Sequence, residues 1–173
     1  YRMSPQNAGC LRAAGLDCCA LANNHVLDWG AAGLLETLQT LERAGIKTAG
    51  AGRDLAQAAA PAVLTVPGKG RVLVFSLAAP SSGAPHAWAA GPDRPGVAMT
   101  DLSLADAEAI AARIGRIGRP GDVVVASIHW GPNWGYEVPD AHRRFAHALI
   151  DQAGVSVVHG HSSHHPMAIE VRR

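Results

Sequence analysis

Histidines gather near the carboxyl end of the sequence, in the stretch VVHGHSSHHPMAIE over residues 157–170. An apolar run ends there, and His159, His161, His164 and His165 follow one another closely, separated by one glycine and two serines. Neutral imidazole nitrogens bind borderline divalent metals such as Zn, Fe, Mn or Co, and they also move protons near neutral pH. The spacing of these residues therefore indicates a metal-binding or acid–base site.

Two other short segments place similar groups directly after an apolar run. Asn23, Asn24 and His25 follow LDCCALA, with Asp28 three residues further on, and His129 follows DVVVASI. If the apolar runs are parallel strands, their carboxyl ends meet at one edge of a sheet, where α/β proteins bind ligands. We expect the three segments to converge on a single site.

Each residue also has a simpler interpretation. His129 alone could be a hydrogen-bonded loop residue, and Asn24 could shape a turn or cap a helix. His159 still lies in strand register, which favours a packing or supporting role. His142 and His147 belong to a helical stretch and are expected on its surface or in its packing. The repeated placement of such groups after predicted strands favours the shared site.

The rest of the chain predicts the elements that would position these groups. Helical spacing of apolar residues, with Pro, Ser and Gly at the expected ends, predicts helices over 4–14, 31–44, 103–116 and 139–153. Apolar runs predict strands over 16–22, 46–50, 61–66, 71–78, 122–128, 155–158 and 167–171. PGKG between two of them indicates a hairpin, and residues 79–99 are expected to form a long loop. Alternating strands and helices of this kind predict an α/β fold.

Composition narrows the class of protein. The chain of 173 residues suits a single domain, and 48% hydrophobic with 17% charged residues is typical of a globular one. A net charge of +1 and few aromatic residues argue against a nucleic-acid partner. No apolar run approaches the ~20 residues that cross a bilayer. Three cysteines, two of them adjacent, do not form a disulfide framework.

Four segments together resemble a known family. LANNHVLDWG, GLLETLQTLERAGIKTAGAG, HWGPNWGYEVP and LIDQAGVSVVHGHSSHHP occur in the order found in the CapA family of bacterial poly-γ-glutamate capsule synthesis proteins, which carry the PGA_cap domain. That family looks like a branch of the calcineurin-like metallophosphoesterases. The resemblance covers nearly the whole chain, so residues 1–173 are expected to be one partial CapA-like metallophosphoesterase domain.

The resemblance implies a metallo-dependent phosphatase-like β-sandwich flanked by helices, in the layer order α/β/β/α. It also implies divalent metal ions, Mn, Fe or Zn, forming a dinuclear centre in the full-length protein. Carried onto this sequence, Asn24 and His129 would bind metal and His25 would protonate the leaving group. His161 takes the place of the first histidine in a motif that often reads Gly-His-His-Pro-His.

The two serines interrupt that motif. By spacing, His164 corresponds to its last histidine and would be the further metal ligand, with His165 as the second choice. Glu137, in the segment after His129, is expected to line the pocket.

The family resemblance also predicts that part of the fold and site lies outside this sequence. The aspartates of the superfamily's first metal position precede NNH, and neither Asp17 nor Asp28 stands in their place. We therefore expect a piece of a longer protein without its first strand and its carboxyl-terminal end. Such a piece would hold one metal weakly or none, and its catalysis would be doubtful. Cytoplasmic and membrane-associated locations both stay open, because a targeting segment would lie upstream of Tyr1.

Three functions follow from these expectations. The first is a metal-dependent phosphoesterase-type hydrolase of poly-γ-glutamate capsule biosynthesis, acting on a phosphoester or polymer substrate. The second is a non-catalytic polymer-binding or scaffold component that works with other capsule synthesis and export proteins. The third is a metal-dependent amidohydrolase acting on γ-glutamyl bonds.

Overall fold

The structure, a computed structural model, describes residues 1–172 and is a mixed α/β fold. Its largest sheet has the strand order β4–β5–β7–β8, and β1–β2 and β3–β6 form two smaller pairs. The strands are β1 (Cys18–Ala20), β2 (Lys47–Ala49), β3 (Ala51–Gly52), β4 (Ala62–Val66), β5 (Gly70–Ala78), β6 (Gly96–Val97), β7 (Val123–His129) and β8 (Val157–His161). The helices are α1 (Gly9–Ala13), α2 (Gly30–Arg43), α3 (Leu55–Ala59), α4 (Leu104–Ile117) and α5 (Asp140–Asp151). The predicted α/β class is confirmed.

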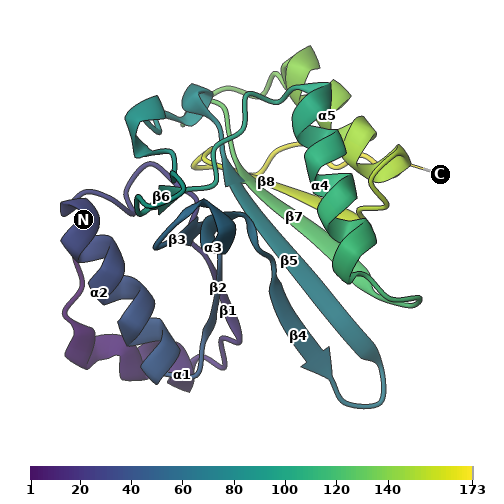
Figure 1. Cartoon of the computed structure of the whole chain (residues 1–173). Coiled ribbons are helices and arrows are strands. Elements are labelled where there is room, and N and C mark those ends of the chain that lie inside the picture. Colours follow the sequence, from purple (N-terminus) through teal and green to yellow (C-terminus); the bar gives the residue numbers. More distant parts are fainter. Residues whose placement is uncertain (173) are drawn as a thin grey trace.

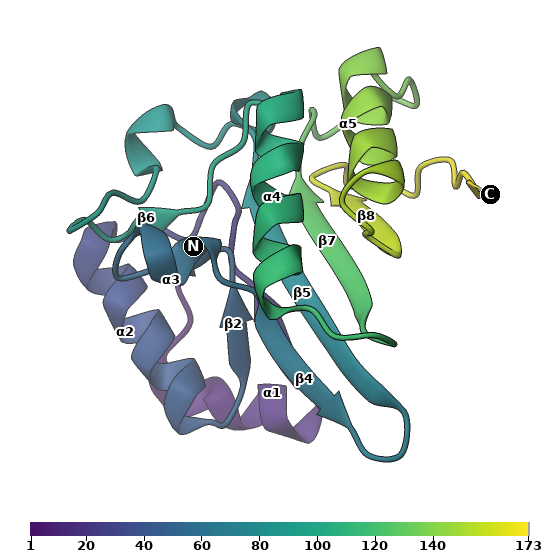
Figure 2. The same cartoon turned by 45° about the vertical axis from the view of Figure 1, so that its right-hand side comes forward.

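The elements lie in layers across the molecule. In Figure 1, α4 and α5 cover one side of the four-stranded sheet, and the β1–β2 pair lies on the other side, followed by α2. Figure 2 shows α4 in front of β5 and β7, with α5 beside β8. The small pair contacts β4 and β5 of the larger sheet. The loop after β1 is thereby brought to the same side of the large sheet as the β1–β2 pair.

Strand direction in the large sheet sets where its loops emerge. β4 and β5 form the antiparallel hairpin that PGKG predicts. β5, β7 and β8 are parallel, with Ala78 opposite His129 and His129 opposite His161. The carboxyl ends of these three strands therefore share one edge of the sheet.

The two faces of the large sheet have different roles. Leu73, Phe75 and Leu77 of β5 pack with Ile128 of β7 and Phe145 of α5 in the main core. Successive residues of a strand point to opposite faces. Ser127, His129, His159 and His161 are therefore left to the other face, which faces the β1–β2 pair.

Local sequence explains the helices that cover these sheets. Ser103 caps α4, and its side chain and that of Asp106 form the reciprocal capping box. In α2 the residues Leu34, Leu38 and Leu41 recur at helical spacing. They are buried in one cluster with Leu21 after β1, Ile46 before β2 and Ala51 of β3. The predicted helices over 31–44, 103–116 and 139–153 are confirmed to within a few residues.

The predicted strand over 167–171 is wrong. Those residues form no strand, and the side chains of Ile169 and Val171 are 93% and 81% exposed. Glu170 instead contacts Arg143 and His147 of α5. An apolar sequence forms a strand only where a sheet edge accepts it, and here the segment is attached to a helix by charged groups.

Smaller differences occur elsewhere. The predicted helix over 4–14 is a 3₁₀ turn, Pro5–Ala8, followed by the short α1, and the Ser4 side chain makes no capping hydrogen bond. The loop predicted over 79–99 contains β6 and two 3₁₀ turns. The sequence-based assignment misses α3, which Asp54 caps. Within residues 1–172, no helix has the length and hydropathy needed to cross a bilayer.

Candidate metal centre

A tight turn after β1 presents the first group of predicted site residues. The Asn23 side-chain oxygen accepts hydrogen bonds from the backbone N–H groups of His25 and Val26, both at 2.8 Å. This Asx-type turn fixes the backbone on both sides of Asn24. The turn-forming role considered for Asn24 therefore belongs to Asn23, and the Asn24 side chain is left to reach the large sheet.

Strand register presents the second group. His129 of β7 and His161 of β8 are directly opposite each other, two residue pairs after Ser127 and His159, which also face each other. The Nδ1 atoms of His129 and His161 lie 3.0 Å apart, and Nε2 of His129 lies 3.1 Å from Oδ1 of Asn24. Asn24, His129 and His161 therefore meet, although they come from three distant segments.

Hydrogen-bond chemistry fixes the protons in this row. An amide oxygen only accepts, so Nε2 of His129 carries the hydrogen shared with Asn24. In the neutral ring, Nδ1 of His129 then accepts a hydrogen bond, and Nδ1 of His161 donates it. Nε2 of His161 is left with a lone pair that no proton occupies. Among the described side chains, that atom is buried and has no hydrogen-bond partner.

The surroundings keep both rings neutral. Burial is the largest cause that lowers the pKa of His129, followed by the charges of His25 and His164. Burial, then the charges of His129 and His159, lowers the pKa of His161 to about 4. A neutral imidazole with an available lone pair is the form in which histidine binds a metal.

His25 lies at the exposed side of the same turn. Its Nδ1 is 3.0 Å from a carboxylate oxygen of Asp28, and 48% of its side chain is exposed. The carboxylate holds Nδ1–H, so Nε2 is the end of the ring that can exchange protons with a substrate. Sequence reasoning did not assign this role to Asp28, although a spacing of three residues from His25 was visible.

The remaining predicted residues are not part of the three-residue contact. His164 is exposed, and its backbone N–H donates to the carbonyl of Asn133. His165 lies against the rings of Trp134 and Tyr136, and its Nε2 is also buried without a partner among the described side chains. Burial thus distinguishes His165 from His164. Glu137 is exposed.

Two histidines expected in packing roles do have packing or supporting partners. The Nδ1 atom of His159 lies 3.1 Å from Ser127 Oγ, and the His159 ring stacks on that of His161. His142 is buried, and its ring lies parallel to that of Trp130 at 4.5 Å between centroids. His159 therefore supports the ring of His161, and His142 packs on the residue that follows His129.

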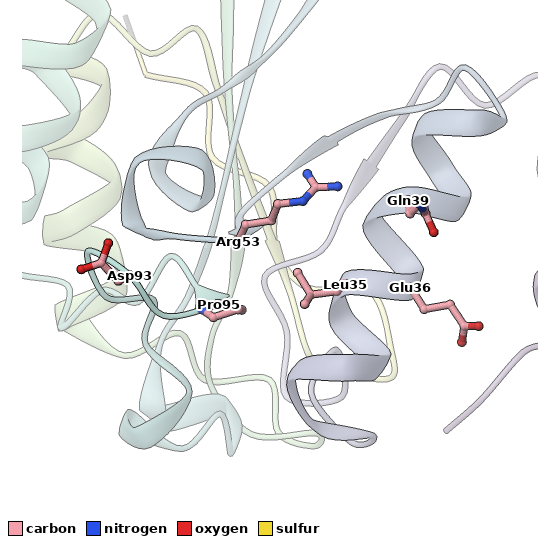
Figure 3. A pocket seen from close by; sticks show the side chains of 6 residues that line it. All are labelled: Leu35, Glu36, Gln39, Arg53, Asp93 and Pro95. Carbon is pink, nitrogen blue, oxygen red and sulfur yellow. The ribbon is translucent and has the colours of Figure 1, made fainter.

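The described residues include no group of three or more His, Cys, Asp or Glu side chains that is placed to hold a metal ion. One hollow of about 620 Å³ lies between α2 and the turn near Pro95, where Arg53 extends towards the helix (Figure 3). It contains none of the predicted site residues. A second, also about 620 Å³, lies beside α2 and includes Asn23 and His25.

The comparison with known proteins agrees with the sequence motifs. The family described as "Bacterial capsule synthesis protein PGA_cap" matches residues 1–173. The chain belongs to this family. The CapA resemblance drawn from the four segments is thereby confirmed.

Proteins that are similar to this chain carry related names. A Mycobacterium tuberculosis protein named "Probable polyglutamine synthesis accessory protein" is 50% identical over 175 residues, covering 100% of this chain and 46% of that protein. The "PGA biosynthesis protein CapA" of Bacillus subtilis is 29% identical over 150 residues, covering 87% of this chain and 37% of that protein. The "Capsule biosynthesis protein CapA" of Bacillus anthracis is 27% identical over 158 residues, which is 89% of this chain and 36% of that protein. The PGA_cap chain thus spans less than half the length of these relatives.

Proposed function

We propose that this chain forms the cation-binding part of a protein that assists poly-γ-glutamate capsule synthesis, and that the protein is a metal-dependent hydrolase of the phosphoesterase type. The observation that carries the proposal is the meeting of Asn24, His129 and His161, which leaves a buried lone pair on Nε2 of His161. The family membership and the names of the relatives support the role in capsule synthesis.

The donor set suits a divalent cation. A buried acceptor without a hydrogen-bond partner costs free energy, and a cation would remove that cost. Imidazole nitrogens with an amide oxygen suit Mn, Fe or Zn. Asn24, His129 and His161 would hold the ion. Both ring nitrogens of His129 already have partners, and the hydrogen bond between the two Nδ1 atoms leaves only one of the two rings with a free Nε2. His129 and His161 can therefore bind the ion together only by giving up that hydrogen bond.

When bound, such an ion polarises a phosphoryl oxygen and makes water a better nucleophile. The chain itself would supply the acid. Asp28 holds Nδ1–H of His25, which leaves Nε2 to deliver a proton to the departing oxygen. Ser127 fixes His159, which stacks against His161 and restricts the tilt of that ring.

The larger arrangement belongs to the same proposal. The layers seen in Figure 1 support a sandwich of the metallophosphoesterase kind, in which the β1–β2 pair belongs to the second sheet. A second ion would use His164 or His165, and the buried Nε2 of His165 favours the latter.

A second candidate is a non-catalytic component that binds polymer or other capsule synthesis proteins. The word "accessory" in the name of the M. tuberculosis relative favours it, as does the exposed position of His164 away from the three-residue contact. In this case Asn24, His129 and His161 would stabilise the sheet edge without binding a cation.

Cation binding tests the proposal first. The protein is freed of metal by a chelator and titrated with Mn²⁺, Zn²⁺ and Co²⁺ in a calorimeter. We expect binding that is lost in His161→Ala and kept in His147→Ala. His147 is a suitable control because it lies on α5 and pairs with Glu170, not with a candidate ligand. Equal affinity in both variants would refute this site.

Hydrolysis then separates the candidates. The full-length protein that contains this chain is assayed with an activated phosphodiester and with a γ-glutamyl anilide. We expect metal-dependent release from the phosphodiester, greatly reduced in His25→Ala while cation affinity stays unchanged. Cleavage of the anilide alone would make the protein an amidohydrolase. Cation binding without cleavage of either substrate would favour the non-catalytic component.

A further inference from the structure

Two serine hydroxyls hold the backbone of one residue, Gly131, between three loops. The N–H of Gly131, just after β7, donates to Oγ of Ser81 in the loop after β5, at 3.1 Å. The carbonyl of Gly131 accepts a hydrogen bond of 2.8 Å from Oγ of Ser162, just after β8. The loops that follow three adjacent parallel strands are thus joined at Gly131.

Ser162 occupies an unusual conformation for a residue with a side chain. Its φ is 130°, a region that glycine occupies readily and other residues rarely. The residue is buried, with 7% of its surface exposed. A glycine would satisfy the backbone, so the serine is explained by its hydroxyl and the hydrogen bond to Gly131.

That hydrogen bond continues the pairing of β7 and β8 past the end of the sheet. The strand register ends at His129 opposite His161, and the N–H of Trp130 then donates to the carbonyl of His161 at 3.0 Å. The hydrogen bond from Ser162 to Gly131 is the next contact between the segments that follow β7 and β8. It is made by a side chain, so it can be removed by substitution without deleting a backbone group.

The spacing of the two loops controls the spacing of the two rings. The Nδ1 atoms of His129 and His161 are 3.0 Å apart, and hydrogen bonds weaken rapidly as such distances increase. The Trp130 indole packs closely on Gly160, because a Cβ added there would come within 2.4 Å of the indole nitrogen. This contact also holds the ends of β7 and β8 together. A small separation of the loops would therefore break the bond that fixes the ring protons.

We propose that Ser162, together with Ser81, is a positioning residue that holds the loops after β5, β7 and β8 together and thereby keeps the rings of His129 and His161 at hydrogen-bonding distance. Ser162, the first of the two serines that interrupt the histidine motif, thereby acquires a specific role. The cation-binding consequence rests on the proposed function, whereas the effect on the ring protons does not.

The test reads the ring nitrogens of the metal-free protein by ¹⁵N NMR, with His129→Ala and His161→Ala for assignment. In the native protein we expect one protonated nitrogen per ring, and an unprotonated Nε2 in His161. In Ser162→Gly, which suits the backbone but lacks the hydroxyl, we expect averaged shifts for both nitrogens of His161. Ser162→Ala and Ser81→Ala are expected to give the same change, larger in the first.

Ser156→Ala is the matched control. Its Oγ accepts from the N–H of Val124 and joins the same two strands at their opposite ends. We expect it to leave the His161 shifts unchanged. Native shifts in Ser162→Gly, or equal disturbance by Ser156→Ala, would overturn the proposal. Should Ser162→Ala fail to fold, Ser162→Gly still decides the question.

Cobalt titration adds a second readout. We expect Ser162→Gly to weaken Co²⁺ binding about tenfold, the size typical of residues that support a metal ligand. Absence of Co²⁺ binding in the native protein would refute the cation site of the proposed function. The ring shifts would still show whether Ser162 positions His161.

Discussion

The two ends of the parallel strands β5, β7 and β8 are closed in different ways. At the amino end, Arg71, the second residue of β5, donates to both carboxylate oxygens of Asp122, which precedes β7. Arg71 also donates to the carbonyl of Ile117, and Asp122 accepts from the N–H of Arg119. At the carboxyl end, the row of Asn24, His129 and His161 ends in a nitrogen without a partner.

The pKa shifts of the two ends have different causes. The hydrogen bond from Arg71 is the largest cause that lowers the pKa of Asp122, so its charged form is satisfied. Burial is the largest cause that lowers the pKa of His161, so its neutral form is enforced without a partner for Nε2. The amino end thus contributes to stability, whereas the carboxyl end keeps a nitrogen lone pair available.

The largest expected effect lies at the carboxyl end. Removal of the His161 ring by His161→Ala takes away the available nitrogen and the partner of His129, and we expect cation affinity to fall more than about 100-fold. The free energy of unfolding should change far less, because that nitrogen makes no hydrogen bond within the described residues. Calorimetric titration and thermal unfolding measure both quantities. A large loss of stability with unchanged affinity would reverse the comparison.

The next effect belongs to the amino end. Asp122→Ala leaves the largely buried guanidinium of Arg71 without its carboxylate, and the side chain of Asp122 itself is only 7% exposed. We expect Tm to fall by several degrees while cation affinity stays the same. Asp122→Asn keeps an acceptor of similar shape, so its Tm should lie between those of the native protein and Asp122→Ala. A change in cation affinity would show that the two ends are coupled.

Acid separates the two ends further. Folding favours neutral His161, whose pKa is lowered from 6.5 to about 4. Its contribution to stability is therefore complete above pH 6.5 and is lost as the pH falls towards 4. The Asp122 contribution is present above its ordinary pKa of 3.8 and is lost only below it. An NMR titration of the His161 ring should show proton uptake near pH 4. Uptake near pH 6.5 would show that burial does not keep His161 neutral.

The smallest expected effect comes from a single hydrogen bond at the amino end of β7 and β8. Ser156→Ala removes the acceptor for the N–H of Val124, a neutral hydrogen bond of 3.2 Å. We expect the free energy of unfolding to fall by about 1 kcal/mol. Urea denaturation measures it. Cation affinity should not change, and a tenfold loss would show that the amino end also positions His161.

The elements were largely predictable because they depend on neighbouring residues. The local signals are the leucines of α2 at helical spacing, the capping residues Ser103 and Asp106, and the glycines of PGKG. Each of them specifies the conformation of residues that are close to it in the sequence. The strand expected over 167–171 fails for the opposite reason. Hydropathy describes Ile169 and Val171, but pairing requires a sheet edge, and Glu170 attaches the segment to α5 instead.

The sequence by itself determined the residue types and their placement after apolar strands, and these suffice to predict candidate cation ligands. It did not distinguish His164 from His165, since their burial depends on where Trp134 and Tyr136 lie. Tertiary structure alone decided that His129 stands opposite His161 and that Asn24 reaches the same ring. Strand register and packing between distant segments set those distances, and the distances determine which ring nitrogen carries the proton.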